Sequence, residues 1–170
     1  KAAPLDTNNN VYSIIHDIRY KQKRYSDAAE AGKKAIQWKE KKSQTVGSGD
    51  YFKVAMDLYL TAAFINKVDT IGRPAMAMRA DSMFAKAIAV NEKWPPFYIN
   101  RARANNLIDY NGTKWLGAPF YDKFNSMVDQ LRAEKMLVDK LLNRTYPKGN
   151  VTILWDTELE EVLGDSSGVT

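Results

Sequence analysis

Cysteine is missing from this sequence of 170 residues, and histidine occurs only once. Without cysteine, the chain can form no disulfide, no thiolate metal site and no cysteine nucleophile. The absence does not decide the compartment, because disulfide-free proteins occur on both sides of a membrane. The single histidine, His16, falls within an expected helix. We interpret it as a structural residue with satisfied hydrogen bonds rather than as a catalytic one.

Long apolar runs and the patterns of common active sites are also missing. The most apolar stretch, residues 55–65, is interrupted by Asp57 and is too short to cross a bilayer. The sequence has no cluster of histidines and carboxylates for a metal, no glycine-rich loop before a helix for a phosphate, and no nucleophile elbow. We therefore expect no enzyme activity, no catalytic residue, no cofactor, no metal site and no membrane span.

The residues that are present favour a folded helical protein. Hydrophobic residues make up 45% and charged residues 26% of the chain, which is ordinary for a globular domain. In the central stretch, residues 80–107, the spacing of Ala80, Phe84 and Ala87 places them on one helical face. Pro95 and Pro96 then end that helix, and a second apolar stripe begins at Tyr98. This stretch predicts two consecutive helices joined by a proline turn.

The same periodicity predicts six helices in three antiparallel pairs. They are expected from Val11 to a break near residue 23, after a cap at Ser26, from residue 48 or 50 to about 67, from residue 74 to the break at Pro95, and over residues 96–109 and 119–143. The first carries an apolar stripe formed by Val11, Ile14, Ile15 and Ile18. Gly32 lies inside the second helix, where glycine costs about 1 kcal/mol relative to alanine, so we expect another helix to approach closely there.

We expect three regions along the chain. Residues 1–8 form a flexible lead-in, residues 9–143 a helical array, and residues 144–170 an irregular tail. Within the tail, residues 151–155 are expected to be a strand or an extended segment, and residues 157–163 one or two helical turns. Because Trp155 and its neighbours are apolar, we expect the tail to fold back as a cap over the end of the array.

The segment from Tyr20 to Ala28 (YKQKRYSDA) resembles the turn between the two helices of a tetratricopeptide repeat, whose consensus is close to YKQGDYDEA. Lys23 replaces the turn glycine, which predicts a distorted turn. The family's pattern of small, large and small residues occurs three times at spacings longer than the family period of 34 residues. The chain therefore resembles bacterial tetratricopeptide repeat proteins with long inter-helix loops. The three copies are Ala28, Gly32, Ala35; Ala80, Phe84, Ala87; and Gly117, Tyr121, Phe124.

The resemblance implies an all-α, right-handed α-α superhelix of about three helical hairpins. In that family, the first helix of each pair lines a concave surface that holds a protein or peptide. The implied function is a non-catalytic protein-interaction scaffold. Ile99 and Arg103 stand where a carboxylate clamp would need lysine and asparagine, so a chaperone-tail binder is disfavoured. The implied groove residues are Ser13, Asp17, Tyr20, Ile99, Arg103 and Asn106.

Arg103 suggests the chemistry of the partner. A guanidinium in a groove can hold a carboxylate through two parallel hydrogen bonds, so we expect a partner segment with an acidic residue. The alternative, which the sequence leaves open, is that Arg103 pairs with a carboxylate of the chain itself.

A second function is suggested by the basic residues of the first two helices. Residues 11–42 contain nine lysines and arginines but only four acidic residues, and the whole chain has a net charge of +5. Binding of a polyanion, either a nucleic acid or an anionic surface, is therefore the alternative function. Nucleic acid is disfavoured as a partner, because aromatic residues are not interleaved with these lysines on exposed faces.

The loops give two further expectations. Trp94 and Trp115 lie between expected helices, and we interpret both as local packing anchors, with stacking on a ligand as the alternative. The chain begins at Lys1 without methionine, so we expect a processed product or a piece of a longer protein. Together with the long loops and the lack of cysteine, this favours a periplasmic or cell-envelope location over a cytoplasmic one.

Overall fold

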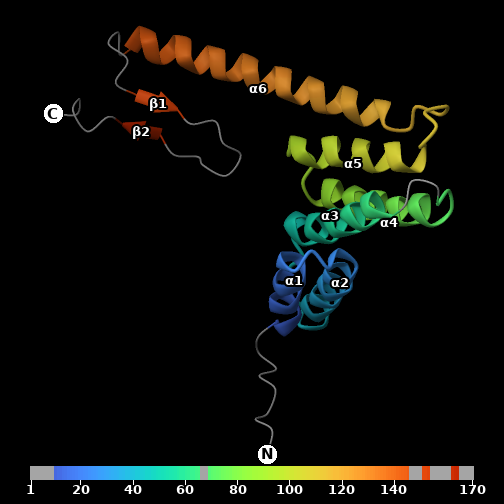
Figure 1. Cartoon of the computed structure of the whole chain (residues 1–170). Coiled ribbons are helices and arrows are strands. Elements are labelled where there is room, and N and C mark those ends of the chain that lie inside the picture. The colour runs from blue at the N-terminus through green and yellow to red at the C-terminus, as the bar shows by residue number, and fades with distance from the viewer. Residues whose placement is uncertain (1–9, 66–68, 146–150, 154–161, 165–170) are drawn as a thin grey trace, which may run out of the picture. The chain divides into compact units, whose positions relative to one another are not determined.

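The computed structural model of this chain describes residues 10–65, 69–145, 151–153 and 162–164, with side chains as far as residue 138. The chain divides into two compact units, Lys1–Phe124 and Asn125–Thr170. Six α-helices form nearly all of the regular structure in the described residues (Figure 1). The expected all-α class is therefore confirmed.

All six expected helices are present, with ends close to the expected ones. The second begins at Tyr25 rather than after Ser26, and the sixth runs past residue 143. The division into units falls inside this sixth helix, after Phe124, and the domain limits expected at residues 8 and 143 stay predictions. The helices are α1 (Val11–Lys21), α2 (Tyr25–Lys41), α3 (Ser48–Phe64), α4 (Gly72–Val90), α5 (Pro95–Ile108) and α6 (Ala118–Thr145).

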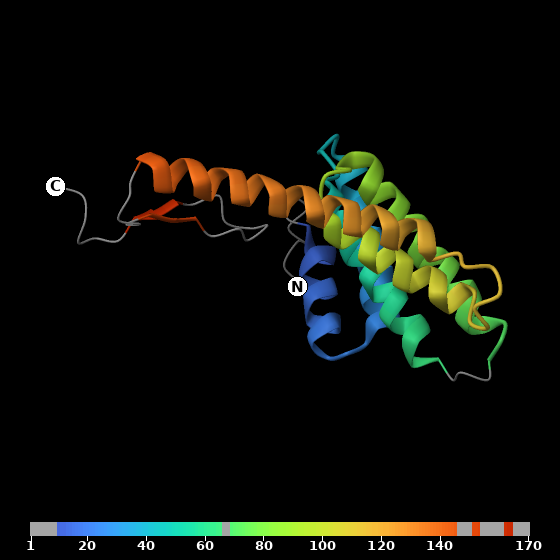
Figure 2. The same ribbon diagram turned by 90° about the horizontal axis from the view of Figure 1, so that it is seen from above.

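Within the first unit, each of the helices α1 to α5 packs against the next one in the chain. Figures 1 and 2 show this order, from the first hairpin (α1 and α2) through α3 and α4 to α5. In addition, α3 contacts α5, so two helices that are not consecutive also lie side by side. An arrangement in which elements contact near neighbours along the chain is typical of repeat proteins.

The core between α3, α4 and α5 contains the residues of the central stretch. Ala80, Phe84 and Ala87 are all fully buried, which confirms the face expected for this helix. Phe52 on α3 lies against Phe84, with 5.8 Å between ring centroids, and against Phe97 on α5 at 5.3 Å. These aromatic contacts join three helices into one cluster.

The two loop tryptophans have different environments. Trp94, at the start of α5, contacts the rings of Phe52 at 5.0 Å and Phe97 at 4.5 Å, so its role as a packing anchor is confirmed. Trp115 is 76% exposed. Its interpretation as a packing anchor is wrong, because the loop before α6 turns this side chain toward solvent instead of toward the helices.

The turn between α1 and α2 is regular although it lacks glycine. Lys23 has φ 57°, the left-handed conformation that the missing glycine would supply. The Lys23 amide donates to the Tyr20 carbonyl at 2.8 Å, and the Arg24 amide donates to the Arg19 carbonyl at 2.9 Å. These are the two hydrogen bonds of a Schellman motif. The expected distortion is therefore wrong, because a complete C-terminal cap holds lysine in this conformation.

Close helix approach at Gly32 is confirmed. A Cβ atom at this position would lie 2.6 Å from Cγ2 of Val54 on α3 and 3.3 Å from Cδ2 of His16 on α1. Both distances are shorter than an ordinary van der Waals contact, and a β-branched valine in a helix has little freedom to move. Three helices therefore meet at the one residue of α2 that has no side chain.

The apolar stripe of α1 lies largely on the surface of the described residues. Ile14 is 59% exposed and Ile18 is 49% exposed, whereas His16 is buried. Periodicity identified the stripe correctly, but α2 and α3 pack against the face that carries His16. The described residues leave this stripe open to solvent.

The second unit contains a short antiparallel pair, β1 (Val151–Ile153) and β2 (Val162–Gly164), with Thr152 opposite Leu163. The strand expected near residue 151 is confirmed. The helical turns expected over residues 157–163 are wrong at their end, because Val162 begins a strand that pairs with β1. Trp155 and residues 1–8 lie outside the described residues, so the cap and the lead-in stay predictions.

Candidate functional site

A buried polar site in the first unit is formed around His16 of α1. Its Nε2 atom lies 2.8 Å from Oδ2 of Asp57 on α3, and its Nδ1 atom lies 2.8 Å from Oδ1 of Asp17. His16 is 6% exposed and Asp57 is fully buried. Because both ring nitrogens have partners, the expectation that the hydrogen bonds of His16 are satisfied is confirmed, and its lack of a catalytic role stays a prediction. We call these three residues the His16 cluster.

Local packing explains why the imidazole fits here. The space beside Gly32 receives the ring, and Tyr20, one turn along α1, stacks on it with 6.3 Å between ring centroids. Asp57 interrupts the apolar stretch of α3 and points its carboxylate at α1. The cluster therefore joins the first hairpin to α3 by a polar contact beside Gly32.

The charges of the cluster are set by mutual contact and burial. The hydrogen bond with Asp57 raises the pKa of His16 above its ordinary value, and burial opposes this less strongly. Burial raises the pKa of Asp57, although the bond with His16 counteracts it. The bond with His16 lowers the pKa of Asp17. With both carboxylates ionised, the protonated imidazole donates a hydrogen bond to each of them.

Stability should consequently depend on pH above 6.5, the ordinary pKa of histidine. Because the pKa of His16 is raised in the folded state, its contribution is complete below 6.5 and is lost as pH rises through the folded value. We expect the melting temperature of the wild type to fall over this interval, and that of His16→Gln to fall less. Thermal melts of both proteins at several pH values measure the difference. Equal slopes would contradict the assignment.

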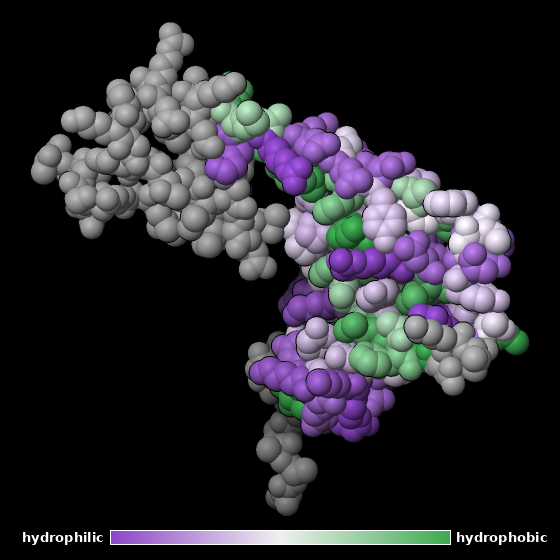
Figure 3. All heavy atoms as spheres, turned by 45° about the horizontal axis from the view of Figure 1, so that its top comes forward, coloured by the Kyte–Doolittle hydropathy of each residue, from purple (hydrophilic) through white to green (hydrophobic). Residues whose placement is uncertain are grey.

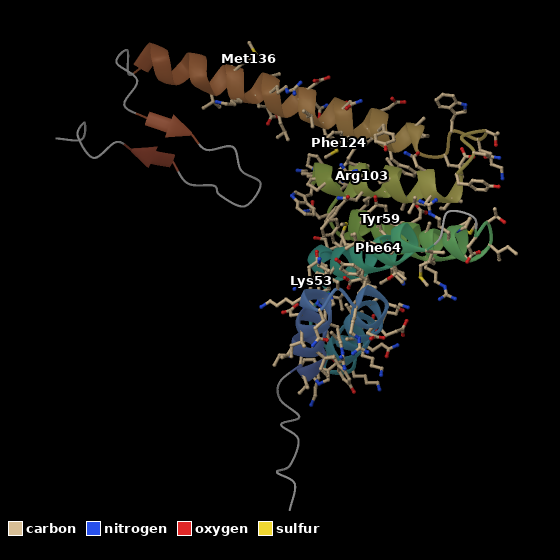
Figure 4. All side chains as sticks on the ribbon, viewed as in Figure 1. Lys53, Tyr59, Phe64, Arg103, Phe124 and Met136 are labelled. Carbon is tan, nitrogen blue, oxygen red and sulfur yellow. The ribbon has the colours of Figure 1, made fainter. Side chains whose placement is uncertain are left out.

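The groove residues expected on α1 lie beside this cluster. Ser13 is half-buried and Tyr20 is 44% exposed. The side chain of Asp17 is 55% exposed, and its carboxylate lies 3.9 Å from the ammonium of Lys53 on α3. Figure 4 labels Lys53 beside the first hairpin. The carboxylate of Asp17 thus accepts a hydrogen bond from His16 and is also exposed at the surface near Lys53.

The groove residues expected on α5 form a second set, separated from the first along the chain by α2 to α4. Ile99 is half-buried, and Arg103 is exposed. The guanidinium of Arg103 donates to Oδ1 of Asn100 at 3.2 Å, and the amide of Asn106 donates to the hydroxyl of Tyr121 at 2.9 Å. Asn106 therefore also helps to hold the start of α6.

The open question about Arg103 is answered for the described residues. Among these, Arg103 has no ion-pair partner. The structural arginine of α5 is Arg101, which binds Asp81 on α4 at 2.7 Å and lies 4.3 Å from the ring centre of Phe120. Asn105 donates to the same carboxylate at 2.6 Å. Arg101 and Asn105 fasten α5 to α4, whereas Arg103 makes no ion pair with a described residue.

Two features of the site were not predicted. In the sequence, Asp57 stands out only because it interrupts an apolar stretch, and this interruption is the signal for a buried polar contact. The second feature is an open hollow of about 480 Å³ lined by Phe64, Tyr25, Lys23 and Arg24. Phe64 is 74% exposed and stacks on Tyr25 at 5.7 Å. Only structure shows that these rings, from α3 and α2, meet.

In the described part of the chain, no group of three or more histidine, aspartate or glutamate side chains is arranged to hold a metal ion. The helices that the structure describes also include none that is both long and apolar enough to cross a membrane.

A stretch of 42 residues in this chain is 52% identical to the thioredoxin reductase of Coxiella burnetii (strain RSA 493 / Nine Mile phase I). The match covers 25% of this chain and 13% of the reductase. No protein-family model matches the chain, and no solved structure matches it. A similarity this short assigns neither the fold nor the activity of that enzyme to this chain.

Proposed function

We propose that this chain is a non-catalytic scaffold that binds a protein or peptide on the concave face of a right-handed superhelix resembling tetratricopeptide repeats. The observation that carries the proposal is the contact between α3 and α5, added to the packing of each helix on the next. If alternate helices are neighbours, the first helices of successive hairpins form one continuous surface. The Schellman turn at Lys23, with its left-handed residue, supports the same repeat geometry.

The proposed groove combines the two sets of residues described above. Ser13, Asp17 and Tyr20 belong to its first hairpin, and Ile99, Arg103 and Asn106 belong to its third. Lys53 of α3, close to Asp17, is the residue that we add for the middle hairpin. The groove then has one cation on α3 and one on α5, with tyrosine and isoleucine side chains for apolar contact.

The free guanidinium of Arg103 favours an acidic partner segment. Arg101, two residues earlier, uses its guanidinium on Asp81, whereas Arg103 contacts only a neutral amide. An arginine held in place by an amide can still bind a carboxylate with two parallel hydrogen bonds. We therefore propose that the partner contributes an aspartate or glutamate to α5.

The test is selection of peptides from a random library displayed on phage, using the wild-type chain as bait. Selected peptides should be enriched in acidic residues, and Arg103→Glu should weaken their binding by about tenfold or more, measured by fluorescence anisotropy. Arg79→Glu is the matched control, because Arg79 is an exposed arginine on α4. Both variants should keep the wild-type melting temperature. Unchanged binding in Arg103→Glu would reject this groove.

Polyanion binding remains the second candidate, and the charge of the first hairpin is the observation that favours it. Its nine basic residues outnumber its four acidic ones, and Figure 3 shows hydrophilic residues crowded over this hairpin. The two functions differ in their response to salt. Counterion release makes polyanion binding fall steeply with salt concentration, whereas a groove with apolar contacts loses little affinity.

A further inference from the structure

The apolar stripe of α1 is a surface that the proposed concave groove does not use. Its residues Ile14, Ile15 and Ile18 are 59%, 37% and 49% exposed, and the neighbouring Tyr12 is 38% exposed. At 100° per residue, Ile14, Ile15 and Ile18 lie on one side of the helix, and Asp17 and Tyr20 lie on another. A helix that exposes three isoleucines on one face offers a site for association.

A groove continues from this stripe onto α2. It has a volume of about 270 Å³ and lies between the two helices of the first hairpin. Its apolar lining comes from Tyr12, Ile15 and Ala31, and its cations are Arg19, Arg24 and Lys34. An apolar groove between two helices, with charged residues along it, is the kind of site that receives a third helix.

Charge determines which kind of helix fits. Two acidic residues also line the groove, but both are already compensated: Asp27 accepts from Arg24 at 2.6 Å, and Glu30 accepts from Lys33 at 2.7 Å. Arg19 donates only to the neutral amide of Gln22 at 3.2 Å, and no ion pair involves Lys34 among the described residues. The groove therefore presents two uncompensated positive charges.

Antiparallel packing separates these two charges along the groove. Arg19 is near the turn, whereas Lys34 is level with the start of α1, since the Asn10 side chain donates to the Ala35 carbonyl at 3.1 Å. The eight residues from Arg19 back to Val11 span ~12 Å at ~1.5 Å per residue. Two turns of a bound helix cover the same length, so its residues i and i+7 reach both ends.

We propose that the groove between α1 and α2 binds an amphipathic helix of a partner protein, with acidic residues at i and i+7 and apolar residues at i+3 and i+4. The apolar pair packs on Ile15, which lines the groove, and on Ile18, which is exposed beside it, and the acidic residues face Arg19 and Lys34. A nucleic acid would satisfy the two charges but would leave the isoleucines exposed to water, which is why the observations favour a helix. This site does not depend on the concave groove.

The probe is a synthetic peptide of 18 residues that contains Glu-Ala-Ala-Leu-Leu-Ala-Lys-Glu in a helix-favouring sequence. Its binding to the whole chain is measured by fluorescence anisotropy at physiological salt, and a peptide with lysine in place of both glutamates is measured beside it. We expect the acidic peptide to bind the wild type at least about tenfold more tightly than the lysine peptide, because both cations attract the first and repel the second.

Four variants locate the site. Ile18→Asp should weaken binding of the acidic peptide by more than about tenfold, since it places a charge on the apolar contact. Ile71→Asp is its matched control, because Ile71 is 82% exposed at the start of α4. Lys34→Glu should weaken binding by about fivefold and strengthen binding of the lysine peptide, whereas Lys42→Glu should change neither. If Ile18→Asp lowers the melting temperature, Lys34→Glu still tests the proposal, because it should reverse the preference between the acidic and the lysine peptide.

Three results would overturn the proposal. The first is equal affinity for the two peptides, or no binding of either at 1 mM, a concentration at which even weak helix-in-groove complexes form. The second is displacement of the acidic peptide by single-stranded DNA together with a steep dependence on salt, which would assign the groove to polyanions. The third is a dimer of the wild type in sedimentation that Ile18→Asp dissociates, which would assign it to a second copy.

Discussion

Replacing Phe84 with alanine should lower the free energy of unfolding by about 3–5 kcal/mol. Phe84 is fully buried, and it lies between Phe52 of α3 and the remainder of the core. Its removal deletes the transfer free energy of an aromatic ring and leaves a cavity lined by three helices. Urea unfolding followed by circular dichroism at 222 nm measures the loss.

Phe64→Ala is the matched control, because the same ring is removed from a residue of α3 that is 74% exposed. Its only aromatic contact among the described residues is with Tyr25, so we expect a loss of about 1 kcal/mol or less. If Phe84→Ala and Phe64→Ala unfold at the same urea concentration, Phe84 is not in the core and the repeat register is wrong.

Replacing Asp57 with alanine should cost about 3–5 kcal/mol near pH 6. The substitution removes the carboxylate that accepts a hydrogen bond from Nε2 of buried His16. The protonated imidazole is then left with one partner, Asp17. At higher pH the imidazole of the variant is neutral, so the cost should be smaller. Urea unfolding of both proteins at pH 6 and pH 9 measures this dependence.

The double variant His16→Leu with Asp57→Leu separates a charge effect from a packing effect. Both polar groups are then replaced by apolar side chains, and a buried ion pair exchanged in this way is often neutral or more stable. We expect the double variant to be more stable than Asp57→Ala. A double variant that is no better than Asp57→Ala would show that the shape of the pair, rather than its charge, holds the first hairpin on α3.

The helices could be predicted because their signals are local. The spacing of Ala80, Phe84 and Ala87 defines a helical face within eight consecutive residues. Pro95 ends the helix through its own effect on the preceding residue. The environment of the α1 stripe could not be predicted in this way. Periodicity tells which residues share a face, but whether another helix covers that face depends on contacts distant in sequence.

The candidate site was predictable to a smaller extent for the same reason. His16 and Asp57 are 41 residues apart, and no local pattern joins them. The sequence leaves open whether Arg103 pairs with a carboxylate of the chain, and only the structure shows that Asp81 on α4 binds Arg101 instead. The α1–α2 groove likewise requires knowing which acidic residues are already compensated.

Gly32 also limits how this protein can be redesigned. The tetratricopeptide repeat pattern that the sequence resembles usually has an aromatic residue where this chain has Gly32, so a design that follows that pattern would introduce one. The new side chain would meet Val54 Cγ2 and His16 Cδ2, which are already within 2.6 Å and 3.3 Å of a Cβ at this position. Residues 16, 32 and 54 must therefore change together. The first hairpin could be exchanged for another repeat only along with the facing side of α3.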